Sequence, residues 1–353
     1  MQTEQTESRP PHSLSEALSR LRQNFRPRAR LSIWRLRLVF GLTLLTFSEI
    51  VVWQNPTARA WYEWPILAIL YVALGSFLLD VIVRFQVHTP AAIGLACGVY
   101  GLLSGSIVNH GAYYSVPIGL IVRVLGLQVG AAFLALMLFL YVMRGVAPPL
   151  LAIGAAALVG VAWGIWVAWY PAQPNIGWGA PLREIAQFYL LAPFIGLGAL
   201  YTFLMPRFEV LRELNLNLLW WEMIACGVPL FLSLTIGIAN NSIPALELLL
   251  PAAIFAFCLW ALYFQQPQDD PSILAQITFS APSLIGYFLL VAPLIFFGIL
   301  TFDAASGALF PLGALLYALV AGFGSGWLPF ASILIFLAVL RTEYPARRKR
   351  RVK

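Results

Sequence analysis

The chain has 353 residues, of which 60% are hydrophobic and 10% charged, and its net charge is +7. Soluble domains carry about 25% charged residues, so this composition excludes a water-soluble fold and predicts an all-α bundle of transmembrane helices. The positive charge does not indicate nucleic-acid binding, because 15 of the 22 Lys and Arg residues lie before Leu38 or after Leu340 and flank the hydrophobic region.

Residues 1–36 form a polar, Arg-rich tail without a cleavable signal peptide. Ser13 and Glu16 have the spacing of a capping box, and the leucines that follow fall on one helical face. This pattern indicates either a short basic helix that binds anionic lipid headgroups at the inner leaflet or a disordered tail. Residues 341–353 form a second basic tail.

Residues 37–340 are predicted to form a single transmembrane domain. A spanning helix needs about 20 apolar residues, and ten segments reach that length between breaks rich in Pro, Gly, Asn and charge. The predicted spans are 37–54, 65–85, 91–109, 115–143, 148–170, 184–205, 219–239, 244–264, 281–302 and 308–340.

Lys and Arg residues are distributed unevenly over the predicted loops. If the N-terminus is inside, the inner segments carry 19 of them, and the outer loops carry only Arg59 and Arg183. By the positive-inside rule this split predicts that both termini are cytoplasmic. We therefore expect a multi-pass protein of the plasma (inner) membrane.

The last segment, 308–340, is too long for one straight span, because its 33 residues would extend about 50 Å as a helix. Residues 322–326, which read Gly-Phe-Gly-Ser-Gly, interrupt it. We expect a broken segment, either with a re-entrant piece before the last span or as two short spans; a tilted kink is the plain alternative.

Residues 191–198 and 291–298 share the pattern A-P-x-I-x-x-G. In the predicted topology the two helices run in opposite directions, as in the inverted repeats of transporters, although chance similarity of apolar helices gives the same pattern. Prolines within the spans of the second half predict kinks there: Pro193, Pro229, Pro251 and Pro293.

Two ionisable residues lie within predicted spans at similar depth from the outer side, Glu49 and Arg123. They are placed to meet as a buried strut between two helices. The functional alternative is an outward-facing site, in which Arg123 binds an anionic group and Glu49 acts as a base or proton carrier.

Other polar residues have local explanations. Asp80 and Arg84 are four residues apart and predict a pair along one helix face. Glu222 and Glu247 begin spans, where we expect them at the membrane interface. In the outer loop, Asn109, His110, Tyr113 and neighbouring polar residues form either a vestibule or an ordinary wet loop.

No Walker, zinc-ligand, G-x-S-x-G or dinucleotide-binding pattern occurs. The three cysteines lie separately in apolar runs, and three histidines are too few for a cytochrome oxidase core or a b-type cytochrome. We therefore expect no cofactor and no metal.

Three classes of function remain. The first is a secondary transporter or permease for a small solute, which the predicted spans, the prolines and the intramembrane charges favour. The second is a non-catalytic subunit or assembly factor with a membrane-protein partner, which the scarcity of polar residues favours. The third is an enzyme acting on a lipid or lipid-linked substrate at the outer face, which the outer polar cluster favours, although no pair of loop carboxylates stands out. Membrane lipids are partners in all three.

Overall fold

The computed structural model describes residues 27–54, 56–113, 116, 119–144, 147–169, 183–204, 216–265, 272–274, 284–306 and 315. These ranges contain helices and turns and no strand. The predicted inner-leaflet helix, the C-terminal tail and, apart from Leu315, the span at 308–340 lie outside them.

The first half of the chain forms four long helices, three of which contain a π-helical segment. They are α2 (Pro27–Leu45) with η1 (Thr46–Val51), α3 (Glu63–Arg84), α4 (Pro90–Leu103) with η3 (Ser104–Val108), and η5 (Leu120–Gln128) with α5 (Val129–Arg144). Two short 3₁₀ turns, η2 (Pro56–Ala58) and η4 (Gly111–Tyr113), lie in the connections.

The second half adds α6 (Leu150–Trp169), α7 (Arg183–Leu204), α8 (Trp220–Ala239), α9 (Leu249–Gln265) and α10 (Leu284–Ser306). Within the described residues, eight helices are long and apolar enough to cross a membrane, and α9 is shorter. The chain is therefore an all-helical multi-pass membrane protein. Nine of the ten predicted spans fall on these helices, within a few residues at most ends.

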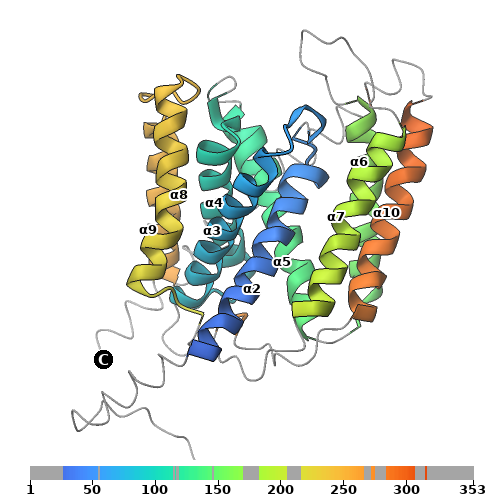
Figure 1. Ribbon diagram of the computed structural model, residues 1–353, viewed down its shortest axis with the longest axis horizontal. Helices are drawn as coiled ribbons and strands as arrows, with labels where there is room; N and C mark the ends of the chain where they lie inside the picture. Colours follow the sequence, from blue (N-terminus) through green and yellow to red (C-terminus); the bar gives the residue numbers. More distant parts are fainter. Residues whose placement is uncertain are drawn as a thin grey trace, which may run out of the picture.

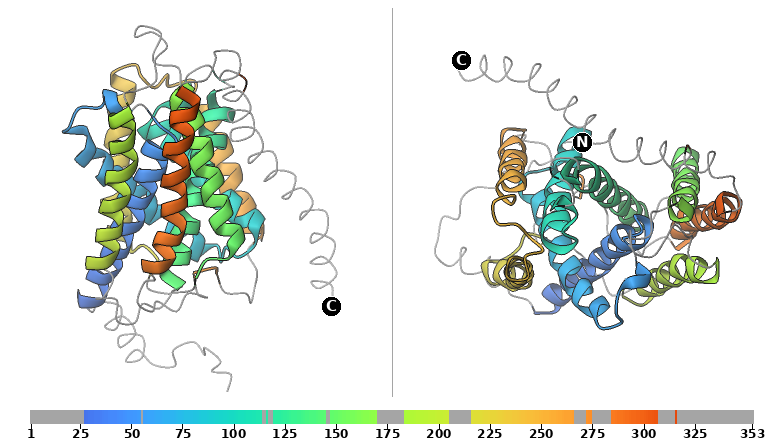
Figure 2. Two further views of the ribbon diagram at one scale, coloured as in Figure 1. Left: turned by 90° about the vertical axis from the view of Figure 1, so that its right-hand side faces the viewer. Right: turned by 90° about the horizontal axis from the view of Figure 1, so that it is seen from above.

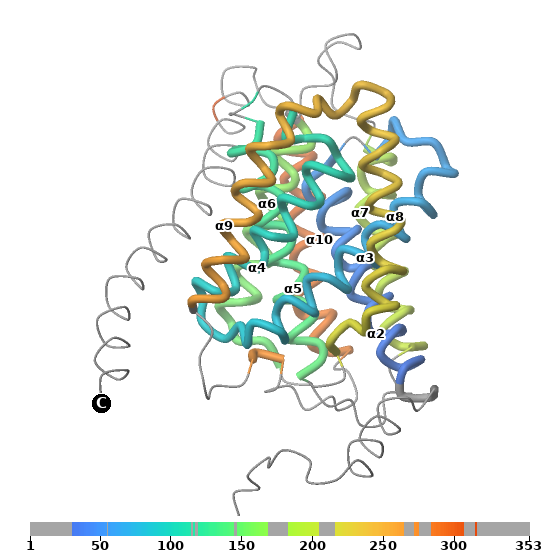
Figure 3. The backbone as a smooth tube through the Cα atoms, turned by 90° about the vertical axis from the view of Figure 1, so that its left-hand side faces the viewer, coloured from blue at the N-terminus to red at the C-terminus, as the bar shows by residue number. Residues whose placement is uncertain are grey.

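The helices form a central group with helices on two sides (Figure 1). The central spans built from α2 to α5 are 61–78% buried, whereas α6, α7, α8 and α10 are only 22–33% buried. On one side α8 packs against α3 and α9 against α4 (Figure 3). On the other side α6, α7 and α10 form a separate group that contacts the centre mainly through α2 and α5 (Figure 2). The poorly buried helices therefore have wide exposed apolar faces.

Helices α6 and α10 approach each other closely because glycines line their contact. A Cβ atom on Gly164 would lie 2.6 Å from the carbonyl oxygen of Gly298, and one on Gly160 would collide with the backbone of Leu294. Small residues at a helix interface let two backbones come close, which is the usual way that helices associate in lipid.

Helices α7 and α10, which carry the A-P-x-I-x-x-G pattern, are neighbours that run in opposite directions. The first residue of α7, Arg183, forms an ion pair of 2.7 Å with Asp303 near the end of α10. Pro193 and Pro293 lie inside these helices. The predicted mid-span position of Pro251 is wrong. α9 begins at Leu249, so this proline lies in the first turn of the helix, where no hydrogen bond is lost.

Candidate functional site

Three π-helical segments gather at one end of the central group: η1, η3 and η5. η3 packs against both α3 and η5, and η1 packs against α5 and α7. A π-helical turn inserts an extra residue into a helix, and such turns occur frequently at functional sites. Two of the segments are followed by non-glycine residues with positive φ, Trp53 (55°) and His110 (53°), a conformation that carries strain.

The carboxylate of Glu49 lies at the centre of this region. It belongs to η1 and its side chain is completely buried. Arg59 donates a hydrogen bond to one carboxylate oxygen at 2.6 Å, and the Tyr71 hydroxyl donates to the other at 2.6 Å. A buried carboxylate with a charged and a neutral donor has both oxygens satisfied, so its charge is well compensated.

Asn109 closes these groups into a ring. Its side-chain amide donates to the Tyr71 hydroxyl at 3.0 Å, and its side-chain oxygen accepts from Arg59 at 3.2 Å. Glu49, Arg59, Tyr71 and Asn109 are called the Glu49 cluster below. The cluster connects η1, the loop before α3, α3 itself and the end of η3.

A second layer of polar groups extends the Glu49 cluster toward η5. Ser104 lies 3.5 Å from the Tyr71 hydroxyl and donates to the side-chain oxygen of Gln128 at 3.3 Å. The Gln128 side-chain nitrogen and the Nε of Arg59 are buried without a hydrogen-bond partner. Buried donors normally have acceptors, so these two groups mark places where an acceptor on a bound molecule would be stabilised.

Helix α6 holds the end of η1 in place. The indole of Trp163 donates to the carbonyl of Ile50 at 3.0 Å, and that of Trp166 donates to the carbonyl of Val52 at 2.9 Å. Both indoles are buried. The conformation of the segment that carries Glu49 is therefore fixed from two sides, by the cluster and by α6.

The expected pairing of Glu49 with Arg123 is wrong, because Arg59 occupies that position. Arg123 lies in η5, where its side-chain stem packs over Gly111, 3.5 Å from where a Cβ would be. Arg59 lies in the connection between η1 and α3, and its side chain points back to the helices and binds the Glu49 carboxylate. Of the candidates from the sequence, Glu49 and Asn109 are thus brought together.

His110 directly follows Asn109 of the Glu49 cluster, and Tyr113 is the last residue of η4. The Nε2 atom of His110 and the hydroxyl of Tyr113 are buried without a hydrogen-bond partner, and the histidine ring abuts Gly237 of α8. Burial, and secondarily the positive charge of Arg59, lower the pKa of His110 below its ordinary value of 6.5. Burial also raises the pKa of Tyr113.

Asp80 lies at the opposite end of the bundle and forms the predicted pair with Arg84, with an N–O distance of 2.9 Å. Its other oxygen accepts from the backbone nitrogen of Leu218 at 2.8 Å. Asp80 therefore anchors the segment that precedes α8, and its contacts are structural.

Glu222, close to Asp80 in the fold, lies in the first turn of α8, so it begins this span as expected. Its side chain is completely buried, accepts from the Leu219 backbone nitrogen at 3.0 Å, and pairs with Arg37 at 3.1 Å and Arg30 at 3.4 Å. The helix α2 begins at Pro27, so these two arginines of the predicted basic flank lie on a membrane helix and are compensated there.

The sequence does not indicate either hydrogen-bonded partner of Glu49, because Arg59 belongs to a predicted outer loop and Tyr71 lies unmarked within a span. The second-layer residues Ser104 and Gln128 were not predicted as part of the site either. Gln128 offered a signal, because an amide in an apolar helix needs a partner. Nothing in a single sequence marked the tyrosine.

Comparison of the chain with protein-family models, with curated proteins and with solved structures found no match. Among the described residues, no group of three His, Cys, Asp or Glu side chains is arranged to bind a metal ion. Within the part of the chain that the structure describes, the Glu49 cluster is therefore the feature that indicates a function.

Proposed function

We propose that the chain is a secondary transporter for a small solute, in which Glu49 binds and releases the coupled proton. The observation that carries the proposal is the completely buried carboxylate of Glu49 within a π-helical segment of a membrane helix. An ionisable group at this depth costs several kcal/mol unless it is compensated, and such groups commonly serve ion or proton pathways.

Protonation of Glu49 would change its contact with Arg59. Glu49 holds Arg59, which is 20% exposed and lies in the connection between η1 and α3. A proton on Glu49 would remove the buried charge that attracts Arg59 and would leave the guanidinium with only Asn109 and the partly exposed Glu63. Proton binding would in this way loosen the loop, as a gate in a coupled transporter requires.

Two unpartnered donors, one in the Glu49 cluster and one in the layer behind it, support a polar group on the solute. The Gln128 nitrogen and the Nε of Arg59 are both buried without a partner, and both carry N–H groups that oxygen acceptors would satisfy. A solute with a carbonyl, hydroxyl or carboxylate oxygen would satisfy them at lower cost than leaving them unpaired.

The 19-to-2 split of Lys and Arg between the predicted inner and outer segments supports the orientation that we propose. We place both termini in the cytoplasm, the ten-span domain in the plasma (inner) membrane, and the Glu49 cluster at the outer side. The basic tails then face the anionic lipids of the cytoplasmic leaflet.

Proton uptake by proteoliposomes tests the proposal. The vesicles contain a trapped pH-sensitive dye, an inside-negative potential drives uptake, and a protein-free ultrafiltrate of a cell extract supplies solutes outside. We expect uptake above that of empty vesicles for the wild type, and its loss in Glu49→Gln. Glu63→Gln is the matched control, because Glu63 lies 3.9 Å from Arg59 but is 40% exposed; this variant should keep the uptake.

A double variant, Glu49→Gln with Arg59→Gln, protects the test against a folding failure. Removing one partner of a buried pair leaves an uncompensated charge, whereas removing both is often nearly neutral for stability. A folded double variant that takes up protons like the wild type would overturn the proposal. The same holds for a wild type that takes up no more than empty vesicles. The Glu49 cluster would then be a strut, as expected of a non-catalytic subunit of a larger complex.

A further inference from the structure

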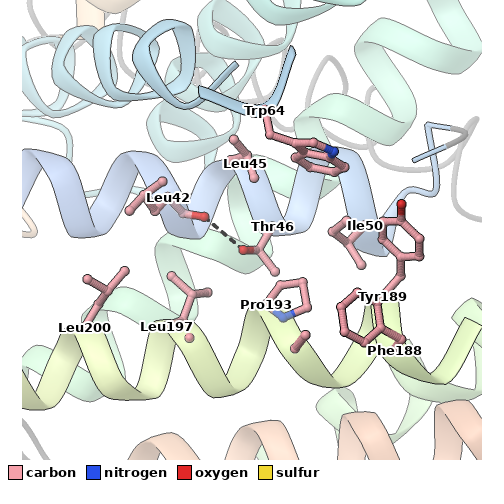
Figure 4. Close-up of a pocket in the computed structure, with 12 residues that line it drawn as sticks. Leu42, Leu45, Thr46, Ile50, Trp64, Phe188, Tyr189, Pro193, Leu197 and Leu200 are labelled. Atoms are coloured by element: carbon pink, nitrogen blue, oxygen red, sulfur yellow. Dashed lines mark hydrogen bonds between the residues drawn. The ribbon is translucent and has the colours of Figure 1, made fainter. Parts of the chain in front are cut away.

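An apolar groove of about 380 Å³ runs between α2 and α7 on the outside of the bundle (Figure 4). The residues that line it come from α2 with η1, from the start of α3 and from α7: Leu42, Leu45, Thr46, Ile50, Trp64, Phe188, Tyr189, Ala192, Pro193, Gly196, Leu197 and Leu200. The hydroxyl of Thr46 donates to the carbonyl of Leu42 at 3.0 Å. The Thr46 hydroxyl is therefore satisfied within its own helix, and the wall between Thr46 and Leu200 suits a hydrocarbon.

The length of the groove matches a single aliphatic chain. From Phe188 to Leu200, α7 advances by twelve residues, or about 18 Å at 1.5 Å per residue. One leaflet of a bilayer contributes about half of a hydrocarbon core of about 30 Å. Gly196 keeps the groove open, since no atom lies within 4 Å of where its Cβ would be.

One end of the groove is amphipathic and the other is not. Trp64 and Tyr189, whose ring centroids are 6.3 Å apart, stand together at the end near Ile50 (Figure 4). Arg183, 60% exposed, begins α7 less than two turns further on. Tryptophan, tyrosine and arginine in this order are typical of headgroup depth. A molecule in the groove would thus place its polar head at this end and its tail toward Leu200.

The groove shares a wall with the Glu49 cluster. Thr46 and Ile50 line the groove and belong to η1, the same π-helical segment as Glu49. The Glu49 carboxylate is directed to Arg59 and Tyr71 instead. A ligand in the groove would therefore contact one face of η1, and Glu49, the proposed proton site, lies on another face of the same segment.

We infer that the groove between α2 and α7 holds the tail of the transported solute, and that this solute is an amphipathic molecule with one aliphatic chain that enters from the bilayer. This inference rests on the proposed function, which it extends by naming the class of solute.

Photolabelling of the full-length protein in phosphatidylcholine vesicles tests the inference. The probe is palmitate with a diazirine in the middle of its chain, and labelled peptides are mapped by mass spectrometry. We expect the label to concentrate on the α2 and α7 residues of the groove. Gly196→Trp should reduce groove labelling at least about tenfold, equivalent to about 1.4 kcal/mol of binding free energy. Gly154→Trp is the matched control, because Gly154 of α6 also has open space around its Cβ but lies outside the groove, and it should leave the labelling unchanged.

Three outcomes would overturn the inference. The first is label spread evenly over the exposed faces of α6 to α10 and insensitive to Gly196→Trp. The second is groove labelling by a diazirine phosphatidylcholine but not by the palmitate, which would assign the groove to a bilayer lipid. The third is no labelling by either probe, as expected if another segment of the chain covers the groove.

The same assay separates this inference from the proposed function. Glu49→Gln removes the proton site without changing the groove lining, so it should keep the labelling pattern. Groove labelling without any Glu49-dependent proton uptake would refute transport and leave the groove as a binding site. Proton uptake without groove labelling would refute only the class of solute.

Discussion

The guanidinium of Arg37 lies 3.1 Å from the carboxylate of Glu222, and both side chains are completely buried. Arg37 also donates to the carbonyl of Leu216 at 3.1 Å. The first membrane helix is therefore joined to the N-terminus of α8 by a charged contact inside the protein. It lies at the opposite end of the bundle from Glu49 and Arg59, so α2 with η1 carries a buried ion pair near each end.

Replacement of Arg37 by Gln should lower the free energy of unfolding by about 3 kcal/mol, because Glu222 would stay buried with only Arg30 to compensate it. Unfolding of the purified protein in mild detergent measures this loss. Arg35→Gln on the same helix is the control, since Arg35 is partly exposed, and it should change stability by less than about 0.5 kcal/mol. If both substitutions lower the free energy of unfolding equally, the buried pair of Arg37 and Glu222 does not stabilise the protein more than a partly exposed arginine does.

Gly164→Leu should destabilise the protein by at least about 1–3 kcal/mol, the usual cost of overpacking. The added side chain meets the α10 backbone, which lies 2.6 Å from the Cβ position. Gly154→Leu on the same helix has open space around it and should leave the unfolding temperature nearly unchanged. If both variants unfold alike, the close approach of α6 and α10 is wrong.

Acidification should destabilise the wild type more than His110→Asn. Burial holds the pKa of His110 in the folded state below 6.5, so the unfolded chain takes up this proton first. Stability is therefore intact above the ordinary pKa and is lost as the pH falls below it. Asparagine tolerates the positive φ at this position. Thermal unfolding between about pH 7 and about pH 5 should show a smaller decline in the variant; parallel declines would speak against a buried neutral imidazole.

The membrane helices could be predicted from the sequence because hydrophobic length decides them. The start of α2 could not, because arginines beside a span normally mark its end. Here Arg30 and Arg37 continue the helix, since Glu222, far away in the chain, compensates them. Such a partner is a property of the packing and leaves no pattern near either residue.

The candidate site was predicted only in part. Glu49 was conspicuous as a lone carboxylate in an apolar run, and Asn109 stood beside a break. The partner Arg59 comes from a loop that folds back on the helices, and no periodicity records such a reversal. The π-helical segments were also invisible, because one inserted residue barely changes a pattern of apolar residues. The ten-span topology and the cytoplasmic termini stay predictions.

The central claim is that Glu49 binds and releases a proton within the membrane. Infrared difference spectroscopy of the reconstituted protein, after a step from neutral to acidic pH, observes this directly through the carbonyl stretch of a protonated carboxyl group. We predict a band from a buried carboxylic acid in the wild type and in Glu63→Gln, and its disappearance in Glu49→Gln. An identical band in Glu49→Gln, or no such band in the wild type, would contradict the assignment of Glu49 as the proton carrier.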